Sequence, residues 1–405
     1  MGEKSSRWGV IDEASIAEAR ALIGVPLRRD RMRWNQVATA DAIRQFCEGV
    51  GDDNPLWCDA TYAASSRWGE QLATPAFLYS VDATIVAPKL PGVQWIYAGT
   101  RWRWYDVVRV DDEFDVSAAL TDVQEKQGRR FGLWVLQTGE IEFRRSDGGL
   151  LCVAQGRVAR TPRRKASAQQ ESAPKKATKV VAESNVEQGP ASPVDLASGR
   201  PLGYKRQGAK PRLWESVQVG DQLATVAITL TLDQIFAWYT GAQGALHYGG
   251  AHADGVRYRR RHDDYEINAK TGAKDSAARG HFSSKEGKDV GMGGTYDVGL
   301  QRIAWVIAYI TDWMGDDAHL AEADIDVVAP NLIGDTTLIN AEVTARWLDE
   351  HPFIELSIIG RNQADRVTTK GRALVVLPSS QHGEVSVPLF NGRRERWTTP
   401  PESQG

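Results

Sequence analysis

Two short loops of the sequence carry side chains that can move protons. GDDNPLWCDA, residues 51–60, contains aspartates and an asparagine, whereas GAQGALHYGG, residues 241–250, has His247 where the first loop has Trp57. Carboxylates and imidazoles are the usual general acids and bases of enzymes. Each loop follows a short amphipathic run with aromatic residues, so we expect the loops to hold equivalent places in two copies of one unit.

The elements around both loops support this duplication. The apolar run TPAFLYSVDATIVA follows the first loop and DVGLQRIAWVIAYITDWMGD follows the second, and each precedes several runs of alternating apolar and polar residues. Such alternation predicts antiparallel strands, and the apolar runs predict buried helices. We therefore expect an α+β protein in which two curved antiparallel sheets each wrap around a central helix. Joined edge to edge, the sheets would protect their edges and form a pseudo-dimer within one chain.

A change in composition divides the chain of 405 residues. Residues 161–210 hold ten Lys and Arg against four Asp and Glu and almost no aromatic residues. A segment of this kind buries too little apolar surface to offset its ordering entropy and predicts a basic flexible linker. We expect an N-terminal domain over 1–160, the linker over 161–210, and a C-terminal domain over 211–405 with an insertion at about 249–290.

The overall composition gives little reason to expect a nucleic acid or a membrane as partner. The net charge is −3, and no apolar run approaches the roughly 18 residues that span a bilayer. Cys47, Cys58 and Cys152 are odd in number and show no CxxC spacing, which predicts a reducing, cytoplasmic location.

The first loop and its surroundings resemble the hydratase motif of MaoC-like proteins, the (R)-specific enoyl-CoA hydratases and fatty-acid-synthase-type dehydratases. Trp57 stands at the histidine position of that motif, and the matching residues are Asp52, Asn54, Pro55, Leu56, Asp59, Ala63 and Gly69. In the second loop His247 occupies the histidine position, while Ala242 and Gly244 replace the motif's Asp and Asn. The resemblance implies a double hot-dog fold whose second half performs the chemistry.

It also implies addition of water to a 2-enoyl-CoA thioester, or its removal, with no cofactor beyond the coenzyme A of the substrate. His247 would be the acid/base group, and backbone N–H groups of Gly293, Gly294 and Thr295 would hold the thioester oxygen at a helix start. Four arginines of the insertion would pair with coenzyme A phosphates: Arg257, Arg259, Arg260 and Arg261. Candidates to replace the missing carboxylate are Asp254, Asp263 and Asp264. The 14 tryptophans favour a channel for a bulky acyl group.

Other interpretations stay open. The chain could be a non-catalytic acyl-CoA-binding subunit completed by a second hot-dog chain, or could form a homodimer. A thioesterase would need a carboxylate on the central helix, for which Asp297 is the candidate. Asp52 and Asn54 are expected to stabilise their loop, since such side chains readily bond local N–H groups. His247, Asp254, His262 and His281 are spaced too irregularly to predict a metal site.

Overall fold

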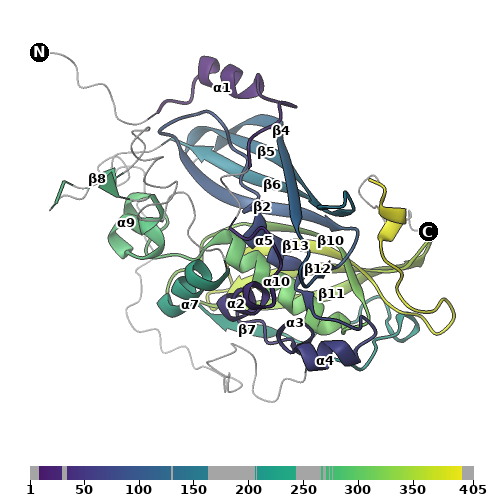
Figure 1. The fold of residues 1–405 in the computed structure, drawn as a ribbon. Coiled ribbons are helices and arrows are strands. Elements are labelled where there is room, and N and C mark those ends of the chain that lie inside the picture. The colour runs from purple at the N-terminus through teal and green to yellow at the C-terminus, as the bar shows by residue number, and fades with distance from the viewer. Residues whose placement is uncertain are drawn as a thin grey trace, which may run out of the picture.

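A computed structural model describes residues 9–29, 34–128, 131–162, 206, 208–242, 266–267, 271–272, 274–275 and 277–394. Strands from both halves form one nine-stranded antiparallel sheet in the order β4-β5-β6-β2-β10-β13-β12-β11-β7. Figure 1 shows this sheet curving around the long helix α10. The predicted edge-to-edge junction is confirmed, because β2 of the first half pairs with β10 of the second.

The first half contains most of the short helices. Its helical elements are α1 (Glu13–Arg20), α2 (Ala40–Val50), α3 (Pro55–Cys58), α4 (Ala60–Ser65), η1 (Pro75–Phe77) and α5 (Leu78–Val81). Its strands are β1 (Leu72–Ala73), β2 (Gln94–Trp104), β3 (Val108–Arg109), β4 (Phe114–Gly128), β5 (Gly132–Arg145) and β6 (Leu150–Thr161).

The second half supplies the long central helix. Its helical elements are η2 (Trp214–Ser216), α7 (Leu232–Ala237), the π-type turn η3 (Trp238–Ala242), η4 (Ala277–His281), α9 (Ser284–Asp289), α10 (Gly299–Met314) and η5 (Leu389–Gly392). Its strands are β7 (Val226–Thr229), β8 (Glu266–Ile267), β9 (Lys274–Asp275), β10 (His319–Val327), β11 (Thr336–Leu348), β12 (Pro352–Asn362) and β13 (Val367–Val376). As its nearly continuous apolar sequence predicts, α10 is buried over most of its length.

The central helix of the first half is much shorter than the sequence predicts. Residues 74–87 were expected to be helical, but helix α5 ends at Val81, and residues 82–93 contain no helix. Asp82 takes an extended conformation and its Oδ1 accepts a hydrogen bond from the Thr84 N–H at 2.8 Å. Because this side chain competes with the helical backbone bond and is also paired with Arg29, the chain turns away from the helix.

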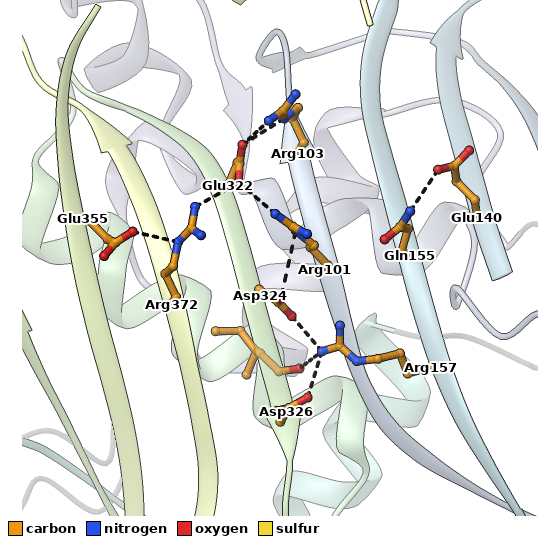
Figure 2. A network of polar contacts seen from close by, with 11 residues as sticks. Arg101, Arg103, Glu140, Gln155, Arg157, Glu322, Asp324, Asp326, Glu355 and Arg372 are labelled. Carbon is orange, nitrogen blue, oxygen red and sulfur yellow. Dashed lines mark hydrogen bonds and ion pairs between the residues drawn. The ribbon is translucent and has the colours of Figure 1, made fainter. Parts of the chain in front are cut away.

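The two halves meet on both faces of the sheet. On the face of α10, helix α2 packs on the π-type turn so closely that a Cβ added to Gly49 would lie 2.7 Å from the Ala242 nitrogen. On the opposite face, the register of β2 and β10 places Arg103 opposite Glu322 and Arg101 opposite Asp324. Figure 2 shows the charged network that continues from these pairs to neighbouring strands. Opposite charges facing each other across strands stabilise a sheet junction.

Several side chains of this network come from strands beside the junction. Arg157 of β6 donates to Asp324 at 2.8 Å and to Asp326 at 3.0 Å, so it reaches across β2 to β10 of the second half (Figure 2). Arg372 of β13 reaches Glu322 at 3.4 Å and Glu355 at 2.9 Å. The two halves are therefore tied together by backbone pairing, by apolar packing and by ion pairs.

Candidate active site

A cavity of about 370 Å³ lies at the start of α10, where the two halves meet. The beginning of β2, the first turn of α10, residues 278–296 and residues 327–330 enclose it. Its wall is mostly apolar and carries four aromatic side chains from the first half: Trp95, Tyr97, Phe131 and Trp134. A largely apolar cavity between two halves with a few polar groups is typical of a small-molecule site.

The first turn of α10 lies at the wall of this cavity. The N-cap residue Val298 has no side-chain capping bond, and Gly299 and Leu300 line the cavity wall. The first N–H groups of a helix have no intrahelical acceptor and favour negative charge. A side chain at 299 would be tight, because its Cβ would lie 3.0 Å from a ring carbon of Tyr97, which would have to shift. This turn can therefore stabilise an oxyanion.

The predicted oxyanion residues lie upstream of this turn. The helix begins at Gly299, so Gly293, Gly294 and Thr295 precede it in irregular chain and are not part of the cavity wall. The carbonyl oxygen of Thr295 accepts a hydrogen bond from the N–H of Ile333 at 3.0 Å, which fixes this segment beside the residues that precede β11. The sequence places the glycine-rich run correctly before the helix but not the helix start itself.

Asp297, the candidate carboxylate of a thioesterase, is buried in an ion pair with Arg302. The Arg302 Nε lies 2.6 Å from Asp297 Oδ2, and both side chains are 1% exposed. Arg302 also donates to the carbonyl oxygens of Ala329 and Thr368, while Asp297 accepts from the Asn331 N–H. A carboxylate bound on both oxygens serves to fix the start of α10 and is a poor nucleophile.

His281 is a cavity-lining residue to which the sequence analysis gives no role in acid/base chemistry. Its Nδ1 lies 2.9 Å from the carbonyl oxygen of Tyr296, and its ring packs on the Tyr296 ring with centroids 4.2 Å apart. Burial lowers the pKa of His281 below its ordinary value. No motif marks this residue, because it ends η4 in the long insertion and is brought to the cavity only by the fold.

The aspartate position of the second loop is closed off. Ala242 is fully buried against α2 and does not line the cavity. Three residues earlier, Tyr239 contacts His281 with ring centroids 6.2 Å apart. The π-type turn therefore lies beside His281.

Several predicted site residues lie outside the described residues. These are His247, the arginines Arg257, Arg259, Arg260 and Arg261, and the candidate acids Asp254, Asp263 and Asp264. Their roles stay predictions.

The first-half motif has a different environment. Trp57 is buried, and its indole Nε1 donates to Asp52 Oδ2 at 3.1 Å. Asp52 Oδ1 accepts from the Asn54 N–H, and Asn54 Oδ1 accepts from the Leu56 N–H and from Arg206. The adjoining cavity measures only about 30 Å³, close to the volume that one water molecule occupies in the liquid. The side chains of Asp52 and Asn54 therefore stabilise the loop that carries them.

Comparisons with known proteins agree with this architecture. Residues 21–152 match the family model described as the dehydratase domain region of FAS1-like proteins. A solved structure described as a MaoC-like dehydratase superposes with a TM-score of 0.60 at 14% identity, over 89% of this chain and 99% of that one. A conserved hypothetical protein from Mycobacterium tuberculosis, described as having a double hotdog fold, gives a TM-score of 0.46 at 12% identity, over 84% and 92%.

The structural match shows the fold of the protein. It has a double hot-dog fold, and its resemblance to the MaoC-like hot-dog dehydratases is confirmed. The sequence has no match among curated proteins. None of the described helices is long and apolar enough to cross a membrane.

Proposed function

We propose that the protein is a hydratase or dehydratase of acyl-CoA thioesters, which adds water to a 2-enoyl-CoA or removes it from a 3-hydroxyacyl-CoA. The observation that carries this proposal is the cavity at the uncapped start of α10, within a fold shared with a MaoC-like dehydratase. Hydration places negative charge on the thioester oxygen, and the N–H groups of Gly299 and Leu300 are suited to stabilise it.

His247 is the proposed acid/base group, on the strength of its motif position. The water oxygen bonds to C3 of the acyl group while the base accepts a water proton, and the π electron pair moves towards the thioester oxygen. C2 then takes a proton from the acid/base group as the enolate collapses, so water and the enoyl thioester together give the 3-hydroxyacyl thioester. The motif of the first half, with Trp57 in the histidine position, has a structural role in this proposal.

The substrate class follows from the cavity and from the insertion. The aromatic rings in the wall, four of them from the first half, favour a bulky or aromatic acyl group over a short one. The arginines at 257 and 259–261 are proposed to bind the phosphates of coenzyme A.

One observation supports a second candidate function, that of a non-catalytic subunit completed by another hot-dog chain. Ala242 stands at the aspartate position and is buried away from the cavity. If no other group in this chain replaces the carboxylate, the site would bind acyl-CoA without turning it over. The buried pairing of Asp297 with Arg302 argues against a thioesterase.

The test is the loss of enoyl-thioester absorbance when the purified protein meets crotonyl-CoA, cinnamoyl-CoA and a polycyclic enoyl-CoA. Loss of the band without release of free thiol, abolished in His247→Ala, supports the hydratase. Release of thiol would support a thioesterase instead. Binding of all three esters without any change in absorbance would favour the non-catalytic subunit.

A further inference from the structure

The titratable side chains that line the cavity differ in their freedom to react. Within the described chain they are Tyr97, His281, Tyr296, Asp297 and Arg302. Asp297 and Arg302 bind each other, and the Tyr97 hydroxyl lies 2.6 Å from the Thr84 hydroxyl. Tyrosines ordinarily titrate near 10, far above neutral pH. His281 is thus the wall residue best suited to exchange protons at neutral pH.

We infer that His281 is a catalytic general base of this cavity and supplies the function of the carboxylate that Ala242 lacks. This inference rests on the hydratase function proposed above. It does not follow from the motif, which contains a single histidine position, here occupied by His247.

The contacts of His281 define its tautomer. The carbonyl oxygen of Tyr296 can only accept a hydrogen bond, so the Nδ1 atom 2.9 Å away carries the hydrogen. The lone pair of the neutral imidazole is then on Nε2, and the described chain places no hydrogen-bond donor on that atom. Ring contacts with Tyr296 and Tyr239 fix the ring plane. The side chain is therefore held as a neutral, oriented base.

Burial favours the neutral form of His281, and the charged groups around it are paired with one another. Burial lowers the pKa of His281, and the backbone of Tyr296 and the charge of Asp297 oppose that shift. Asp297 is neutralised by Arg302, and Arg279 beside the histidine pairs with Glu286 at 2.8 Å. Tyr239 faces the ring from the π-type turn. The acid limb of the rate profile should therefore lie below the ordinary histidine pKa of 6.5.

The proposed step conserves atoms and charge. Nε2 of His281 accepts a proton from water as the water oxygen bonds to C3, and the π pair of C2=C3 moves into the enolate of the thioester. C2 takes a proton from the acid/base group proposed above as the carbonyl is restored. The proton on His281 passes through solvent to that group, so both groups return to their starting states. Dehydration is the reverse of these steps.

The experiment compares wild type with His281→Gln, His281→Asn and the control His382→Gln, on whichever enoyl-CoA of the panel the wild type consumes. His382 is exposed and lies outside the cavity wall. Asparagine preserves a donor for the Tyr296 carbonyl and removes only the base. Both His281 variants should lose about 10²–10⁴-fold in kcat with little change in KM, and should lose the acid limb of the pH profile. His382→Gln should match wild type.

Two outcomes would contradict the reasoning, and they differ. If wild type turns over a thioester and a folded His281→Asn retains kcat within about threefold, the role of His281 is refuted while the hydratase survives. If wild type consumes none of the esters, the hydratase proposal fails and the inference fails with it. Folding is checked by the urea midpoint, and the site by the Kd of butyryl-CoA and cinnamoyl-CoA.

Discussion

The ion pair at the start of α10 makes a quantitative prediction. Asp297 and Arg302 are each 1% exposed and are joined by two hydrogen bonds, of 2.6 Å and 2.5 Å. Removing Asp297 leaves a buried guanidinium whose remaining described partners are the carbonyl oxygens of Ala329 and Thr368. Breaking a buried pair on one side costs about 3–5 kcal/mol, so Asp297→Ala should lower the free energy of unfolding by that amount.

The partner variant and the double variant test whether the cost belongs to the pair. Arg302→Met leaves a buried carboxylate without its partner and should also lower the free energy of unfolding by about 3–5 kcal/mol. The double variant buries no unpaired charge, so its loss should be much smaller than the sum of the two single losses. The free energy of unfolding of a natural domain is roughly 5–15 kcal/mol, so the unfolding of the single variants should remain measurable.

Urea unfolding followed by tryptophan fluorescence measures all three variants. Asp289→Asn is the control, since its pair with Lys285 is exposed and should leave the unfolding midpoint unchanged. Should Asp297→Ala not fold, Asp297→Asn preserves the shape of the side chain and removes only the charge. A loss below about 1 kcal/mol for Asp297→Ala, or strict additivity in the double variant, would refute the assigned role of the pair.

Two further predictions concern residues that line the small cavity beside the first-half motif. Trp57→Ala removes a buried indole that donates to Asp52, so urea unfolding should show a loss of about 3–5 kcal/mol in the free energy of unfolding. Restoring the motif histidine with Trp57→His should not rescue turnover in His247→Ala. His319 is buried with Nε2 3.1 Å from the Trp104 carbonyl, and burial lowers its pKa to about 4. Because the unfolded chain takes up this proton at higher pH, stability should fall as pH drops from 6.5 towards 4, by about 3 kcal/mol for this group. The same titration of His319→Gln should have a shallower slope, and an unchanged slope would contradict the assignment.

The fold was largely predictable because its signals are periodic. Alternating residues mark the strands from Phe114 to Thr161 and from Thr336 to Val376, and the dense apolar run marks α10. The length of the first-half helix was overestimated, because periodicity does not reveal that the side chain of Asp82 bonds a backbone N–H that a continued helix would use. Helix composition also cannot locate the start of α10 within a glycine-rich run.

The candidate site was harder to predict than the fold. Motif spacing predicted the loop positions of Trp57 and His247, of which only Trp57 lies among the described residues. His281 has no such spacing, and its approach to the cavity depends on packing between Tyr239 and Tyr296. Tertiary contacts between residues distant in sequence leave no local pattern to read.

The short helix of the first half and the position of the cavity have a common cause. Gly139 and Gly156 pair across β5 and β6, and a Cβ at Gly156 would lie 1.8 Å from the carbonyl oxygen of Thr84. A Cβ at Gly139 would lie 2.1 Å from the Cβ of Val86. The chain after α5 therefore lies directly on the sheet, where a helix would stand farther off.

The two halves accordingly contribute different parts of one site. Beyond this flat segment, the ends of β2, β5 and β6 expose Trp134, Ala159 and Thr161 to the cavity. The second half covers the same space with the first turn of α10 and with His281. In the proposed reaction the sheet of the first half accommodates the acyl group, while the second half stabilises charge and moves protons.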